Sequence, residues 1–241
     1  ELTMDDIFEL HGIKRQRDSA PPNPSPTWQD TETIAKAVLK NPGLAKKLYE
    51  IHREEKGIRP ISKAKENPES LDKHLPAGLS VSHIPENGWN DDTNKKWCKY
   101  LGGGWLETWC GELVRGIAKS DEVSVGVNCV RKNGHKFEID VALVRGHRLY
   151  VISCTTDTTL GLCKSKLFEV AMRARQLGGD LARFALVSLL HGAHIDQLKN
   201  DVADVWEAPN PPRAFGMDDL KEWAGIQGQP NTSSLMEWLD S

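Results

Sequence analysis

The spacing of apolar residues changes in the middle of the chain from a helical period to a strand period. Residues 105–118 carry a broad apolar stripe, which predicts a helix. Residues 123–130 and 137–144 are rich in β-branched side chains and flank the turn signal RKNG at residues 131–134, which predicts a hairpin. Residues 149–154 are almost wholly apolar, as expected of a central strand covered on both faces.

Two later elements complete an alternating α/β pattern. Residues 164–177 place apolar side chains on one helix face and end at Gly178-Gly179, and residues 184–190 predict another buried strand. The order is therefore a helix, three strands joined by tight turns, a crossover helix and a strand. This order predicts an α/β fold with a mixed sheet flanked by helices.

The N-terminal part of the chain predicts helices interrupted by a linker. A cap-like Thr3 opens a short helix in residues 2–11, and residues 30–54 predict two helices broken near residues 41–43. Between them, residues 18–26 hold four prolines, which exclude regular structure and predict a linker.

The remaining segments complete the expected organisation. A loop and two peripheral helices are predicted at residues 59–70, 194–206 and 217–223. We therefore expect a helical N-terminal appendage, a core and a helical C-terminal extension, at residues 1–96, 97–192 and 193–241.

Composition narrows the functional classes. With 241 residues and a net charge of −3, the chain can form a substantial domain, and any nucleic-acid contact must come from a local basic patch. Five cysteines without a CxxC pair argue against a zinc ribbon or a disulfide framework and favour a reducing cytoplasm, and eight histidines without an HxH or HxxxH pair argue against zinc. No apolar run is long enough for a membrane span and no export signal is present.

Four short motifs occur in a defined order along the core. They are GWLE at residues 104–107, FEID at residues 137–140, SCT at residues 153–155 and LGG at residues 177–179. Together they resemble the signature of the PD-(D/E)XK, or restriction-endonuclease-like, nucleases. The closer similarity is to the nuclease half of CRISPR-associated proteins in which a domain that senses cyclic oligoadenylate, called CARF, precedes such a nuclease.

The resemblance implies a set of site residues. Asp140, Glu138 and Ser153 would bind Mg²⁺ or Mn²⁺, because hard divalent cations are held mainly by oxygen ligands. Glu107 would act from the helix before the sheet, and Thr155 would line the site. The whole set implies hydrolysis of phosphodiester bonds.

Two of these positions depart from the family pattern. Ser153 stands where many relatives have a carboxylate, and Thr155 stands where a lysine is usual. That lysine would orient the attacking water and offset charge in the transition state, which Thr155 cannot do. Lys164 and Lys166 begin the next helix, whose start should lie near the end of the strand, so either lysine could take its place.

Each candidate also has a purely structural explanation. Asp140 and Glu138 alternate with apolar residues and could form a solvated strand face. Glu107 is explained by the helix dipole, and Cys154 by its place as a small apolar residue in a buried strand. Four tryptophans, at positions 89, 97, 105 and 109, favour packing of the appendage over base stacking.

The helix from residue 164 also carries cations. Arg173 and Arg175 could contact nucleic-acid phosphates or form a solvated face, in which Glu169 and Arg173 are an ordinary i,i+4 pair.

Three functional hypotheses remain. The first is a metal-dependent nuclease acting on DNA or RNA, an ancillary effector of CRISPR-type defence. The second is a catalytically degenerate domain that binds nucleic acid or dimerises, and the third is different chemistry on the same scaffold.

The expected partners extend beyond the substrate. Cleavage of both strands of a duplex favours a twofold homodimer, with the helices around residues 89–109 as the expected contact. No glycine-rich nucleotide-binding turn is present, so a sensor domain would precede Glu1 or be a separate partner. The start at Glu1 instead of methionine is compatible with a fragment of a longer protein.

Overall fold

The computed structural model describes residues 3–16, 25–52, 91–119, 122–206 and 210–241. These residues form two compact units, one made of Glu1–Ser19 with Cys110–Ser241 and the other of Ala20–Trp109. The loop predicted at residues 59–70, Trp89 and most of the proline linker lie outside the described residues.

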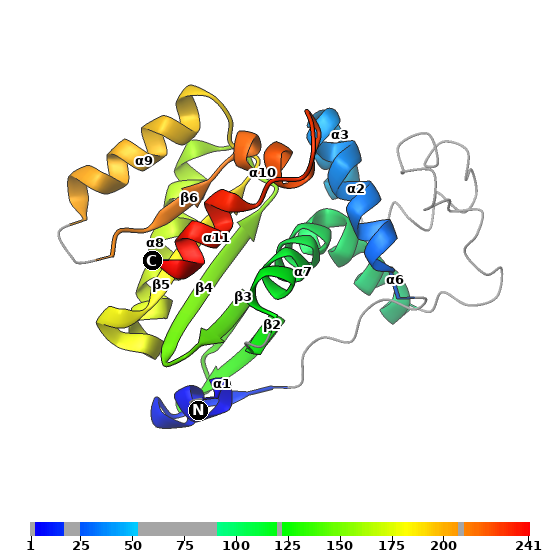
Figure 1. Cartoon of the computed structure of the whole chain (residues 1–241). Helices are drawn as coiled ribbons and strands as arrows, with labels where there is room; N and C mark the ends of the chain where they lie inside the picture. The colour runs from blue at the N-terminus through cyan, green and yellow to red at the C-terminus, as the bar shows by residue number, and fades with distance from the viewer. Residues whose placement is uncertain (1–2, 17–24, 53–90, 120–121, 207–209) are drawn as a thin grey trace. The chain divides into compact units, whose positions relative to one another are not determined.

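The first unit is built on one six-stranded mixed sheet (Figure 1). Its strands, in spatial order, are β1 (Ile13–Arg15), β2 (Glu122–Arg131), β3 (Lys136–Arg145), β4 (Arg148–Thr155), β5 (Arg183–Ser188) and β6 (Arg213–Phe215). The strands from β1 to β4 are antiparallel, and β5 and β6 continue the sheet in parallel with β4. The predicted mixed α/β sheet is confirmed, including the interior place of the apolar strand at residues 149–154.

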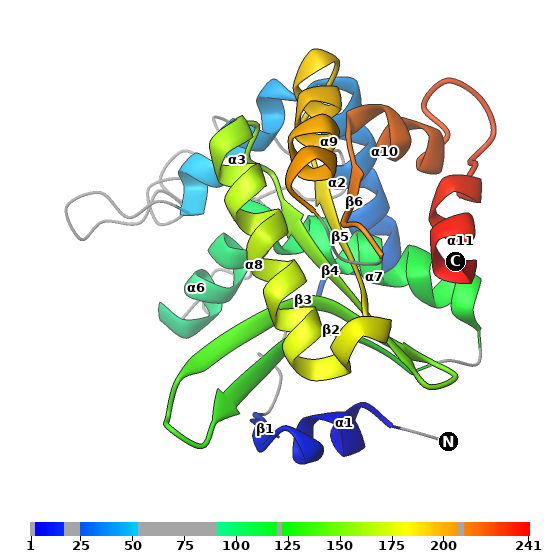
Figure 2. The same cartoon turned by 90° about the vertical axis from the view of Figure 1, so that its left-hand side faces the viewer.

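One long helix covers a face of this sheet. The helix α8 (Leu160–Gly178) packs on β4 and β5 and supplies the crossover between these parallel strands (Figure 2). Its buried side chains, among them Leu167, Ala171 and Ala174, join a core that includes Val151 and Leu186 of the sheet. The helix begins four residues before the predicted start at residue 164, after Thr159 in extended conformation.

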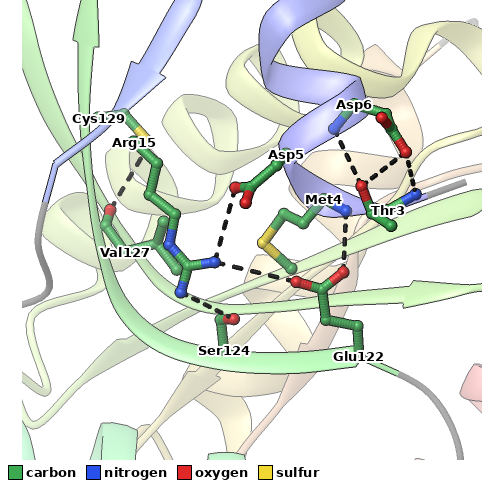
Figure 3. A network of polar contacts seen from close by, with 9 residues as sticks. All are labelled: Thr3, Met4, Asp5, Asp6, Arg15, Glu122, Ser124, Val127 and Cys129. Atoms are coloured by element: carbon green, nitrogen blue, oxygen red, sulfur yellow. Dashed lines mark hydrogen bonds and ion pairs between the residues drawn. The ribbon is translucent and has the colours of Figure 1, made fainter.

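The start of the chain is tied to the edge of the sheet. Helix α1 (Met4–Leu10) has a capping box between Thr3 and Asp6, as the sequence indicated. The guanidinium group of Arg15 lies 3.8 Å from Asp5 and 3.9 Å from Glu122, and it donates to Ser124 Oγ at 3.2 Å (Figure 3). Backbone pairing of β1 with β2 and this polar network hold residues 3–15 on the sheet.

The end of the chain also belongs to the first unit. Its helices are α9 (Ala193–Val205), α10 (Met217–Trp223) and α11 (Ser233–Asp240). Trp238 of α11 meets the ring of Tyr150 edge to face at 5.4 Å, and the Tyr150 hydroxyl donates to the carbonyl of Leu239 at 2.9 Å. Residues from both ends therefore contribute to the sheet unit, so its bounds differ from the expected division at residues 96 and 192.

The second unit is helical. It contains α2 (Trp28–Lys40), α3 (Gly43–His52), α6 (Asp91–Lys99) and the π-helical segment Tyr100–Gly104, and it ends within α7 (Trp105–Ala118). The predicted break between α2 and α3 is confirmed. A buried hydrogen bond of 2.7 Å joins the hydroxyls of Thr31 and Tyr100, and burial raises the pKa of Tyr100 to about 12.

No helix in the described parts of the chain is both long and apolar enough to cross a membrane.

Candidate active site

The candidate site lies where β3 and β4 stop pairing. The ladder between the two strands runs from Arg145 opposite Arg148 to Val141 opposite Ile152. Beyond this point the side chain of Asp140 supplies the acceptor: its Oδ2 atom accepts the backbone N–H of Cys154 at 2.7 Å and the hydroxyl of Ser153 at 3.0 Å. The carboxylate is thereby fixed in place by β4.

A cavity of about 250 Å³ opens beside this carboxylate. It is bounded by strand residues and by one side of α8. The polar residues that line it are Glu138, Asp140, Ser153, Lys166, Glu169 and Arg173. The structure therefore brings together five of the predicted site residues, from two strands and a helix.

Asp140 is held in an environment that disfavours its charge. Burial raises the pKa of Asp140 above its ordinary value, and the nearby carboxylate of Glu138 acts in the same direction. The Cys154 N–H, the positive charge of Lys166 and the Ser153 hydroxyl act in the opposite direction. The pKa stays raised, so an additional cation in the cavity would be electrostatically favoured.

The two candidate lysines of α8 have different surroundings. Lys166 lines the cavity and, within the described ranges, makes no hydrogen bond or ion pair. Lys164 instead forms an ion pair with Asp201 at 3.2 Å and does not line the cavity. Only Lys166 is therefore placed near Asp140.

This cavity falls inside a segment that is similar to a known nuclease domain. Residues 94–203 match the Card1-like endonuclease domain. The matched segment, called here the Card1-like segment, includes β2 to β5 and α8 and hence every residue that lines the cavity. The predicted resemblance to a nuclease domain is confirmed for this segment.

Two solved structures share the fold of the chain. Protein VC1899 from Vibrio cholerae has a TM-score of 0.63 and 20% identity, and Can2 from Sulfobacillus thermosulfidooxidans, in complex with cyclic tetra-adenylate, has a TM-score of 0.65 and 15% identity. Each comparison covers 100% of this chain and 62% of the other, so the chain spans less than two thirds of the length of either protein. No curated protein sequence matches the chain significantly.

Thr155 of the Card1-like segment lies outside the cavity. Its side chain is buried, and its Oγ1 atom accepts the backbone N–H of Asp157 at 3.2 Å. This hydrogen bond stabilises the turn between β4 and α8. The position at which the resemblance predicts a lysine is thus occupied by a side chain with a structural contact.

The predicted phosphate-binding arginines separate in the same way. Arg173 lines the cavity, pairs with Glu169 and places its guanidinium carbon 4.7 Å from the centre of the Phe137 ring. Arg175, also on α8, does not line this cavity and forms an ion pair with Asp180 at 2.6 Å.

Glu107 belongs to the helical unit. It lies in the first turn of α7, within Ala20–Trp109, where a negative charge suits the positive end of the helix dipole.

Sequence reasoning did not assign a site role to Glu169 or Phe137. The spacing from Lys166 to Glu169 and Arg173 is three and then four residues, which places all three on one helix face. Once Lys166 is a candidate, that spacing indicates that Glu169 and Arg173 lie on the same side of the helix as Lys166. The stacking of Phe137 on Arg173 had no such signal.

The donor set of the cavity fits a hard divalent cation with few protein ligands. Among the described residues, no group of three or more His, Cys, Asp and Glu side chains is arranged to hold a metal ion. Mg²⁺ is commonly held by one or two carboxylates, with waters and substrate oxygens as the other ligands. Asp140 and Glu138 provide two such groups, and β4 holds the Oδ2 atom of Asp140 through two hydrogen bonds.

Proposed function

We propose that the cavity hydrolyses phosphodiester bonds of nucleic acid with the help of Mg²⁺ or Mn²⁺. The observation that carries this proposal is the place of Lys166, beside Asp140 in the cavity of the Card1-like segment. The ammonium group of Lys166 would take the role that the family pattern gives to a lysine at the position of Thr155.

Each polar residue has a role in this proposal. Asp140 and Glu138 would hold the divalent cation, which would stabilise negative charge on the phosphate being cleaved. Ser153 would keep the Asp140 carboxylate oriented through its hydrogen bond and lie in the outer part of the ligand set. Lys166 would orient the attacking water and offset charge that develops in the transition state. Arg173, fixed by Glu169 and Phe137, would contact a phosphate of the bound strand.

The proposal extends to the biological setting. We place the chain among ancillary nucleases of CRISPR-type defence, controlled by a sensor that binds a cyclic oligonucleotide, as in the Can2 complex with cyclic tetra-adenylate. That sensor would be another part of the same protein or a separate partner. DNA and RNA are both substrates to be tested.

The two lysines of α8 offer a matched test. Lys166→Ala should lower turnover of a cleaved substrate at least about 100-fold while binding changes little, because the lost contact acts on charge formed in the transition state. Lys164→Ala is the control, since Lys164 pairs with Asp201 outside the cavity. Plasmid, single-stranded DNA and RNA would be the substrates, each with Mg²⁺, Mn²⁺ and an EDTA control. Equal loss in both variants would contradict the assignment of Lys166.

Asp140→Asn tests the metal ligand in the same assay. The substitution keeps the shape of the side chain and removes the anion, so metal-dependent cleavage should fall by orders of magnitude. Asp204→Asn, at an exposed position on α9, is the control. Cleavage that survives both Asp140→Asn and EDTA would refute the metal site.

The burial of Thr155 favours a second candidate function. Its contact with Asp157 is structural, so this strand position supplies no cation for catalysis, as expected of a domain that binds nucleic acid without cutting it. In that case the native protein cleaves nothing with Mg²⁺ or Mn²⁺, and Asp140→Asn leaves nucleic-acid binding unchanged.

A further inference from the structure

The turn between β2 and β3 concentrates positive charge on a chain whose net charge is −3. Residues 131–136, with the sequence RKNGHK, contain three permanent cations and no acid. Lys132, His135 and Lys136 are exposed. Within the part of the chain that the structure describes, neither lysine has a hydrogen bond or an ion pair. Their charge is therefore uncompensated by neighbouring side chains.

The backbone of this turn is fixed by hydrogen bonds. Gly134 has a φ angle of +81°, and its N–H donates to the carbonyl of Arg131 at 2.8 Å. The N–H of Arg131 donates to the carbonyl of His135 at 2.9 Å, and the N–H of His135 donates to Asn133 Oδ1 at 3.1 Å. A left-handed glycine and closed backbone pairs make a rigid turn, so the cations are presented from a preformed support at the end of the hairpin (Figure 2).

Side chains connect this turn with the cavity. The Arg131 guanidinium carbon lies 5.5 Å from the centre of the Phe137 ring, and that of Arg173 lies 4.7 Å from the same ring. Arg131 also donates to Gln176 of α8. Because Arg173 lines the cavity, the Phe137 ring and Gln176 connect Arg131, the first residue of the turn, with α8 and the cavity.

We infer that residues 131–136, called here the basic arm, bind phosphates of the nucleic-acid strand whose scissile bond lies in the cavity. The inference rests on the proposed function and adds the surface that holds the substrate. A strand carries one phosphate per nucleotide, so exposed cations on a turn that Arg131 connects with the cavity match the charge of the segment that flanks the scissile bond. A lysine ammonium group is a point charge that can contact the phosphates of any base sequence. The basic arm therefore contributes affinity without base preference.

The test replaces both lysines of the basic arm in the full chain. Lys132→Ala with Lys136→Ala is combined with Asp140→Asn, so that binding of fluorescently labelled single-stranded DNA, RNA and duplex DNA is measured without cleavage. The matched control is Lys40→Ala with Lys199→Ala, which removes two exposed lysines from α2 and α9. Thermal melts check that each variant is folded.

The expected result has two parts. Affinity for duplex DNA at low salt should fall at least about tenfold relative to the control, and the slope of log affinity against log salt should decrease by about 2, one for each lost phosphate contact. With Asp140 restored, cleavage should show a raised KM and a nearly unchanged kcat.

Three outcomes separate the inference from the proposed function. If the native chain cleaves and the arm variant binds and cleaves as the control does, the basic arm is not the substrate surface and the proposed function stands. If the native chain binds nucleic acid with the expected arm dependence but cleaves nothing, the inference holds for a binding domain and the nuclease proposal fails. If the native chain neither binds nor cleaves, both are overturned.

Discussion

Asp140 carries a negative charge into a partly buried gap between two strands, where its neighbours compensate it incompletely. Two hydrogen bonds from β4 and the ammonium group of Lys166 favour the ionised form, while burial and Glu138 oppose it, with burial the largest effect. An ionised carboxylate in this environment lowers the stability of the folded protein, and a bound cation would stabilise it. Perturbed pKa values of this kind are common at functional sites, and they give a measurable link between the site and the fold.

The raised pKa of Asp140 predicts a specific dependence of stability on pH. An acid with a higher pKa in the folded state binds protons more tightly when folded, so it lowers stability progressively as pH rises from the ordinary value of 3.8 through the folded value. Above that window the full cost is present. Asp140→Asn should therefore be at least as stable as the native protein at neutral pH without metal, with the difference shrinking as pH falls. Chemical denaturation at several pH values measures this, and a variant less stable at neutral pH would contradict it.

Thr155 predicts that restoring the usual lysine of the family will fail. Thr155→Lys removes the hydrogen bond to Asp157 and places an ammonium group where the native side chain is 7% exposed. We expect a loss of about 1–3 kcal/mol in the free energy of unfolding and no gain in cleavage. Thr158→Lys, three residues later at an exposed position, is the control. A rise in cleavage with unchanged stability would show that the strand position is still catalytic.

At the scale of elements, the sheet includes two strands that are too short to show a strand pattern in the sequence. β1 and β6 have three residues each, and their places are set by what flanks them. β1 is held beside β2 by the polar network of Arg15 with Asp5, Glu122 and Ser124 (Figure 3). This network links α1, β1 and β2, and it supports the edge of the sheet from which the basic arm extends.

Removal of Arg15 should loosen this edge. The Arg15 side chain is 26% exposed, so its ion pairs are only partly screened, and its loss also leaves Glu122 with fewer contacts. Arg15→Ala should lower the free energy of unfolding by about 1 kcal/mol. The neighbouring Lys14 is exposed, and Lys14→Ala should have no measurable effect on stability. Hydrogen exchange would report whether the amides of β1 and β2 lose protection first, and equal effects of the two variants would contradict the role of the network.

At the scale of the whole molecule, the sheet unit is assembled from both ends of the chain. Residues 3–15 and 213–240 contribute strands and helices to a unit whose site lies in the middle of the sequence. In the helical unit, Trp97, Trp105 and Trp109 are buried, so their indole rings are already packed within the protein. A dimer contact near these helices would therefore use their other side chains.

The twofold homodimer is a prediction for the full-length protein. Cleavage of both strands of a duplex is simplest when two active sites act together, and cyclic symmetry of two is the commonest way to pair identical subunits. Sedimentation equilibrium should show a dimer, and plasmid cleavage should give linear product at the same rate as nicked product. A monomer at tens of micromolar, together with nicking alone, would contradict this.

The sequence alone determined the main elements, because their signals are local. Apolar spacing, the RKNG turn, the Thr3 cap and the proline and glycine breaks located the four central strands and all the described α-helices except α6 and α11, and the order of four short motifs led to the nuclease fold. It also identified Asp140, Glu138, Ser153 and two lysines as candidates. Each of these inferences depends on short runs of residues or on the order of such runs along the chain.

The tertiary structure decided which candidates meet. Lys164 and Lys166 are equivalent in sequence, but the turn of α8 directs one toward Asp201 and the other toward Asp140. The same packing buries Thr155, stacks Arg173 on Phe137 and adds β1 and β6 to the sheet. These contacts join residues far apart in sequence, and their geometry depends on how a helix lies on a sheet. No local pattern of residues contains that information.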